Sequence, residues 1–205
     1  PELMSIPDSL QTLNYLTATA DHLYWTSNVD GRYYLVRLDG NDELLNVTAL
    51  SAFPLILSIL EDDIYVFLGR GEGIRRFSPT AGVLDTVARN TLGLRDINQI
   101  SSTGISDGKL VSFTRVNNRW RLSIYDPVVD SLFINETAQL EGNNFLTPLV
   151  CLNDRIFVHQ FVRDTGILVR EYLPESDVFR RPAGLDQWQD RYDLFQELDG
   201  KLFLS

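Results

Sequence analysis

The chain has 205 residues, of which 44% are hydrophobic and 22% charged, so it is a globular chain with room for one sizeable core. Its formal net charge of −10 makes nucleic acid a poor partner. No apolar run approaches the roughly 18 residues of a membrane span, and the single cysteine, Cys151, excludes an intramolecular disulfide framework and a cysteine-based zinc site.

The first clear elements lie in residues 21–40, DHLYWTSNVDGRYYLVRLDG. Two runs rich in aliphatic and aromatic residues flank a polar turn, which predicts two strands joined tightly. Similar phrases, each an acidic or glycine-containing turn before an apolar strand, recur as DDIYVF at 62, DGKLVSF at 107, NDRIFVH at 153 and DGKLFLS at 199. Their first aliphatic residues are spaced 41, 46, 46 and 46 residues apart, so one structural unit repeats.

Each phrase is followed by a turn, a second strand that ends near Asp or Pro, a loop, a third strand, and an apolar segment before the next phrase. Four short strands per unit predict an all-β fold, a β-propeller with four-stranded antiparallel blades and about five blades in all. The predicted units of this single domain, 1–205, lie near 13–53, 54–96, 97–145 and 146–191, with a closing blade of 192–205 and 1–8. A fragment of a larger propeller is the alternative.

The first phrase also carries a family resemblance. DHLYWTSNVDGRYYLVRLDG resembles a blade of the YWTD-type propellers of lipoprotein-receptor ectodomains and their bacterial relatives, although Ser27 stands where that family has Asp. The copies IYVFLG, LVSFTR and IFVHQF keep only the strand pattern, and the cadence is also similar to kelch-like and ELWxTDGT-type repeats. The resemblance supports the propeller fold across the chain and implies no receptor function.

In an up-and-down blade, alternate turns lie at opposite ends of the sheet, so the predicted propeller has two loop faces. One face is acidic, and carboxylates that cap their own turns explain most of it; no DxDxDG-like spacing indicates calcium. The other face carries the Arg, Asn and Trp side chains typical of recognition surfaces, and we expect binding there. Its candidate ligand-binding residues are Asn28, Asp30, Arg32, Arg70, Asn117, Arg119, Trp120, Arg163, Trp188 and Arg191. A solvated loop face, with Trp120 and Trp188 tucked between blades, is the alternative.

Residues suited to catalysis are sparse. His22 and His159 share no zinc or triad motif, and GRGEG at 69–73 lacks both the GK[ST] and the helix of a phosphate-binding loop. Glycoside hydrolysis would need carboxylates on the innermost strands, where only Asp193 and Glu197 occur. We therefore expect no enzyme activity, no metal site and no cofactor.

These features favour a binding, adhesion or protein-interaction module of a secreted or surface protein. We expect an extracellular, cell-surface or periplasmic location and a protein or glycan ligand. A carbohydrate-active propeller and a structural spacer within a larger protein are the alternatives. Because the chain starts at Pro1 without a visible signal peptide, we expect a processed product or part of a longer chain. The sequons at Asn46 and Asn135 matter only if the chain is secreted.

Overall fold

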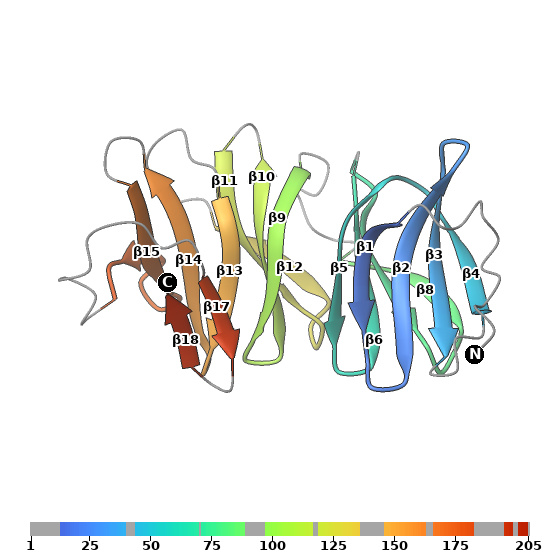
Figure 1. Ribbon diagram of the computed structural model, residues 1–205. Helices are drawn as coiled ribbons and strands as arrows, with labels where there is room; N and C mark the ends of the chain where they lie inside the picture. Colours follow the sequence, from blue (N-terminus) through green and yellow to red (C-terminus); the bar gives the residue numbers. More distant parts are fainter. Residues whose placement is uncertain are drawn as a thin grey trace. The chain divides into compact units, whose positions relative to one another are not determined.

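The computed structural model describes residues 13–39, 44–69, 71–88, 97–116, 119–135, 146–162, 166–182, 195–198 and 201–204. Within these ranges every regular element is a β-strand, which confirms the all-β class (Figure 1). The predicted pairing of residues 192–205 with residues 1–8 involves an N-terminal segment outside the described part. The five-blade count therefore stays a prediction.

The strands form four four-stranded antiparallel sheets, each in simple sequential order. Sheet 1 contains β1 (Leu13–Ala18), β2 (His22–Val29), β3 (Arg32–Asp39) and β4 (Leu44–Leu50). Sheet 2 contains β5 (Pro54–Leu60), β6 (Asp63–Leu68), β7 (Gly73–Ser78) and β8 (Val83–Val87). Sheet 3 contains β9 (Ile97–Ser106), β10 (Lys109–Val116), β11 (Arg119–Asp126) and β12 (Ser131–Ile134). Sheet 4 contains β13 (Leu146–Leu152), β14 (Arg155–Val162), β15 (Gly166–Leu173) and β16 (Val178–Arg180), and β17 (Phe195–Leu198) pairs with β18 (Lys201–Leu204). The predicted four-stranded blade is thus confirmed.

The chain divides into two compact units, residues 1–95 and residues 96–205. Unit 1 holds sheets 1 and 2, and unit 2 holds sheets 3 and 4 with the β17–β18 pair. Within each unit the first strands of neighbouring sheets contact one another: β1 contacts β5, and β13 contacts both β9 and β17. This is the arrangement of neighbouring propeller blades, whose first strands are innermost.

Short acidic turns connect the strands as the repeat predicts. Positive φ angles occur at both central residues of the Asp30-Gly31 turn (51° and 78°) and of the Asp107-Gly108 turn (49° and 64°). This backbone defines the type I′ hairpin turn, whose twist matches that of the flanking strands. Asp and Gly tolerate these angles better than most residues, so the Asp-Gly dipeptides set the strand register.

The core lies between adjacent sheets. Tyr24 and Leu35 of sheet 1 pack with Ile64 and Phe77 of sheet 2. In unit 2, the corresponding cluster contains Val111, Phe113 and Leu122 of sheet 3 with Leu149, Ile156, Val158 and Tyr172 of sheet 4. Because successive strand residues alternate between faces, each sheet contributes one row of side chains to each neighbouring layer.

One glycine marks a close approach between strands β9 and β13. A Cβ atom on Gly104 would lie 2.8 Å from both Cys151 Sγ and Leu149 Cδ2. Burial, with a smaller contribution from the Asp154 charge, raises the pKa of the Cys151 thiol to about 12. Cys151 is therefore a packing residue in this layer and is present as the unreactive thiol at neutral pH.

Candidate functional site

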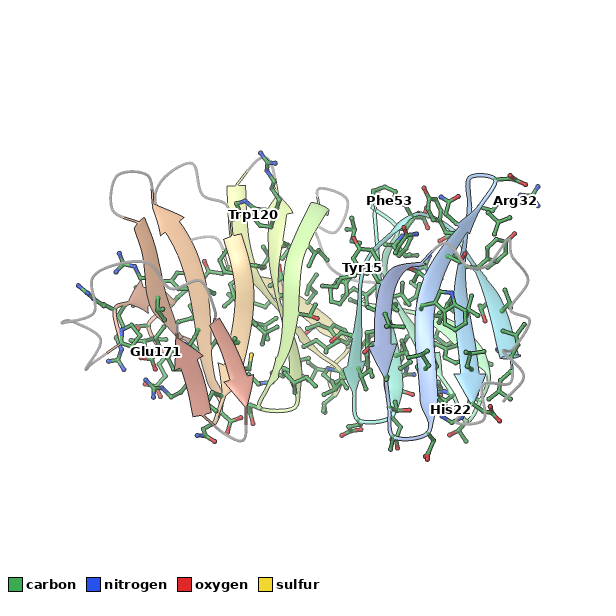
Figure 2. The ribbon with its side chains drawn as sticks, in the orientation of Figure 1. Tyr15, His22, Arg32, Phe53, Trp120 and Glu171 are labelled. Carbon is green, nitrogen blue, oxygen red and sulfur yellow. The ribbon has the colours of Figure 1, made fainter. Side chains whose placement is uncertain are left out.

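The tip of the β2–β3 hairpin gathers three of the predicted site residues. Asn28 ends β2, and its Oδ1 accepts a hydrogen bond from the Gly31 amide at 3.1 Å. Asp30 and Arg32 are exposed on either side of Gly31, and Figure 2 shows Arg32 at the hairpin tip. The type I′ turn and the Asn28 bond order the tip, so an acid and a guanidinium face solvent from a fixed backbone.

A polar network lies at the corresponding end of sheet 2. Glu72 Oε2 accepts hydrogen bonds from Ser51 Oγ at 3.1 Å and from Arg75 NH2 at 3.2 Å. These residues come from the β4–β5 connection, the β6–β7 turn and β7. Arg70, the predicted site residue of this turn, lies outside the described residues. The network shows that this end of the sheet holds paired polar groups close to solvent.

In unit 2 the predicted tryptophan contributes to packing. Trp120 is partly buried, and its ring lies 6.3 Å from the Phe113 ring beside the sheet 3–sheet 4 core (Figure 2). This placement matches the alternative of a tryptophan tucked between blades. Arg119 begins β11, but its side chain is outside the described part. So are the predicted site residues Asn117, Arg163, Trp188 and Arg191.

At the opposite, acidic end, each sheet has one cross-strand pair at an equivalent position of its third and fourth strands. These pairs are Arg37–Asn46, Arg76–Asp85, Ile124–Phe133 and Glu171–Arg180 in sheets 1 to 4. Three pairs are polar and the pair in sheet 3 is apolar. We call this set the outer pairs.

The outer pair of sheet 4 includes a buried carboxylate. Glu171 is 2% exposed, and its two oxygens accept hydrogen bonds from Arg155 Nε at 2.6 Å and Arg180 Nε at 3.1 Å. The hydrogen bond from Arg155 is the main cause that lowers the pKa of Glu171; burial opposes it, and Arg180 adds to the lowering. Arg155 also lies over the Phe157 ring, 4.8 Å from its centroid. The Glu171 carboxylate thus orders two arginines on one face of the sheet.

The outer pair of sheet 1 contacts one of the two histidines. Arg37 donates from NH2 to His22 Nε2 at 2.7 Å and from NH1 to the Pro79 carbonyl at 3.2 Å. His22 is half-buried at the start of β2, as expected for a turn histidine (Figure 2). The side chains of His159 and Glu197, and all of Asp193, lie outside the described part. Among the described residues, no three His, Cys, Asp or Glu side chains are placed to hold a metal ion.

Beside the apolar outer pair of sheet 3, an open groove of about 420 Å³ runs between sheets 3 and 4 of unit 2. It is lined by Lys109, Ile124, Asp126, Ser131, Phe133, Tyr172, Pro174 and Asp177, and we call it the sheet 3–4 groove. Lys109 Nζ lies 3.6 Å from Asp126 Oδ2 and 3.7 Å from Asp107 Oδ2. The sequence did not predict this groove, which lies at the acidic end rather than at the arginine- and asparagine-rich end.

A buried hydrogen-bond chain supports one wall of the groove. The Tyr172 hydroxyl donates to Asp177 Oδ1 at 2.6 Å and accepts from Asn135 Nδ2 at 3.2 Å. Burial, followed by the Asp177 hydrogen bond and charge, raises the pKa of Tyr172 well above its usual range. Asn135, the acceptor of the second sequon, is fully buried here, so a glycan on it is incompatible with this fold. Asn46 of the first sequon is half-buried on β4.

Comparisons with known proteins define the fold class. No protein-family model matches the chain, and no curated protein matches it. Among solved structures, puromycin hydrolase matches 96% of the chain with a TM-score of 0.60 at 13% identity. A protein from Lactobacillus plantarum matches 84% of it with a TM-score of 0.59 at 15% identity. An auxiliary nutrient binding protein from Bacteroides ovatus matches 86% with a TM-score of 0.58 at 13% identity.

The matched structures contain β-propellers, so the four sheets are blades of the β-propeller class. Because these sequence identities are low, the similarity shows only that the fold is shared. The chain spans 33% of the puromycin hydrolase chain, 55% of the Lactobacillus plantarum chain and 43% of the Bacteroides ovatus chain. No helix in the described ranges is long and apolar enough to cross a membrane.

Proposed function

We propose that this chain is a non-catalytic binding module of a secreted or surface protein, which recognises a polar protein or glycan through the turns at its arginine- and asparagine-rich end. The observation that carries the proposal is the β2–β3 tip. Its backbone is held by the type I′ turn and by the bond from the Gly31 amide to Asn28, while Asp30 and Arg32 are exposed.

A rigid turn suits recognition because little conformational entropy is lost when a ligand binds to it. Arg32 offers a planar, always-charged donor to carboxylates, sulfates or carbonyl groups, and Asp30 offers an acceptor to hydroxyl or amide donors. Such a donor–acceptor pair fits sugar hydroxyls and polar peptide groups equally well. The binding chemistry is therefore polar, and the two ligand classes are distinguished by the screen below.

The test is a glycan array and an affinity capture with the intact chain, followed by titration of the selected ligand. Arg32→Ala and Asn28→Ala are the test variants, since one removes the exposed donor and the other the support of the turn. Asp62→Asn is the matched control, because Asp62 is exposed in unit 1 in a turn at the opposite end of its sheet. Trp120→Ala is unsuitable as a binding probe, because loss of that ring also removes packing against Phe113.

We expect Arg32→Ala to weaken the selected interaction by about tenfold or more, as at other arginine hot spots. Asn28→Ala should weaken it less, and Asp62→Asn should leave it unchanged. Equal affinity of the wild type and Arg32→Ala for every selected ligand would refute recognition through this tip.

A further inference from the structure

The outer pairs single out sheet 3. At this position sheets 1, 2 and 4 place Arg37–Asn46, Arg76–Asp85 and Glu171–Arg180, so the fold accommodates polar and charged residues here. Sheet 3 has Ile124 and Phe133 instead, and the Phe133 residue remains 52% exposed. The repeat does not require a half-exposed aromatic ring at this position, because the other three sheets have polar or charged residues there.

The same hairpin carries further exposed apolar residues. Val128 and Val129, at the tip of the β11–β12 turn, are both largely exposed. Their amides donate to Asp126 Oδ1 at 2.9 and 3.4 Å, so the turn is ordered while its side chains face solvent. In the matching turn phrases FSPTAG and YLPESD, the equivalent positions are Thr-Ala and Glu-Ser. Exposed apolar residues gathered on one ordered hairpin are typical of an interaction surface.

Among the described residues that line the sheet 3–4 groove, the charged side chains carry a net negative charge. Asp126 and Asp177 line it, and Lys109 is the cation among its lining residues. Asp107 lies close to Lys109, and Asp130, Asp154 and Glu175 occupy the turns at this end of unit 2. This distribution attracts a cation and repels an anion.

We propose that the sheet 3–4 groove binds an arginine side chain carried by a basic, extended segment of a partner protein. The aliphatic stem of that arginine would lie against Ile124 and Pro174, its planar guanidinium would stack on the Phe133 ring, and its charge would lie beside Asp126 and Asp177. Arginine fits this combination because it joins an apolar stem to a flat, weakly hydrated cation. An open groove suits a side chain presented on a partner's backbone. Within its sheets, this site lies at the acidic end, whereas the proposed function uses turns at the other end of each sheet. The two proposals are therefore independent.

The test uses the intact chain and a fluorescein-labelled nonapeptide of alternating Arg and Ser, followed by fluorescence anisotropy at about 0.15 M salt. The same peptide with Lys or with Glu in place of Arg tests whether binding is specific for arginine. Phe133→Asp is the decisive variant, because it copies the Asp85 of sheet 2, removes the ring and adds a negative charge. Val178→Ala is the control, since Val178 is an exposed apolar residue of the same unit that does not line the groove. Melting temperatures check that each variant is folded.

We expect saturable binding of the Arg peptide, weaker binding of the Lys peptide, and none of the Glu peptide. Phe133→Asp and Asp126→Asn should each weaken binding of the Arg peptide about tenfold or more, while Val178→Ala leaves it unchanged. Non-specific attraction to an acidic surface predicts the opposite sign, because Phe133→Asp would then bind more tightly. Equal or tighter binding by Phe133→Asp, no saturable binding by the wild type, or equally tight binding of acetyl-arginine amide would each overturn the proposal.

Discussion

Glu171 gives the sharpest stability prediction, because it is a buried carboxylate between two arginines. We expect Glu171→Gln to lower the free energy of unfolding by about 2–3 kcal/mol. The carboxylate accepts two charge-assisted hydrogen bonds, from Arg155 and Arg180, and such bonds contribute roughly 1.5–3 kcal/mol each. Both guanidiniums are about half exposed and regain water when the charge is lost, so the cost falls below the roughly 3–5 kcal/mol of a fully buried broken pair. A glutamine keeps the volume, but its NH2 group must face one of the two guanidinium donors.

Urea unfolding at pH 7 measures this difference, with Glu175→Gln as the control because Glu175 is exposed in the β15–β16 turn. The pH dependence gives a second check. The folded-state pKa of Glu171 lies below its ordinary value of 4.5, so its stabilisation is complete above that value and is lost as the pH falls through the folded pKa. The gap between wild type and Glu171→Gln should therefore narrow in acid. A difference under about 0.5 kcal/mol at pH 7, or a gap that widens on acidification, would refute this account of Glu171.

Three further predictions concern packing and modification. Gly104→Ala should lower the free energy of unfolding by about 1–3 kcal/mol, because its Cβ would meet Cys151 and Leu149. Thr103→Ala is the neighbouring control. An unchanged melting temperature of Gly104→Ala would contradict the close approach. Cys151, whose thiol pKa is raised to about 12, should resist a thiol-specific reagent at pH 8 in the native chain and react on unfolding; fast native labelling would show an exposed thiolate. Folded chain secreted from eukaryotic cells should carry no glycan on buried Asn135, as mass spectrometry of its peptides will show, whereas occupancy there would mean that the Tyr172–Asn135 bond is absent.

The sequence predicted the parts of the fold that depend on local chemistry. Asp-Gly phrases set the type I′ turns, as at Asp107-Gly108, and alternating apolar residues set the strands between them. These signals are contained within a few residues. They repeat, so each copy supports the others.

Features that depend on contacts between sheets could not be decided from the sequence. For Trp120 the sequence left both a binding face and packing between blades open, and the structure shows its ring against Phe113 of the same sheet, beside the sheet 3–sheet 4 core. Asn135 lies in a glycosylation sequon, and only the structure shows that its side chain hydrogen-bonds to Tyr172 of the neighbouring sheet. One signal was available: aligning the repeats residue by residue, rather than strand by strand, places Ile124 in register with Arg37, Arg76 and Glu171. This alignment of the repeats identifies Ile124, beside the groove, as the one apolar residue at that position from the sequence alone.

Hydrogen–deuterium exchange of the intact chain, with and without its selected ligand, is the measurement that decides whether recognition occurs through the arginine- and asparagine-rich turns. Recognition through the β2–β3 tip predicts slower exchange on binding at residues 28–32, and no change in the β1–β2 turn at the other end of sheet 1. Arg32→Ala should abolish the protection at the same ligand concentration. Protection confined to the opposite turns, or protection at 28–32 that persists in Arg32→Ala, would contradict recognition through this tip.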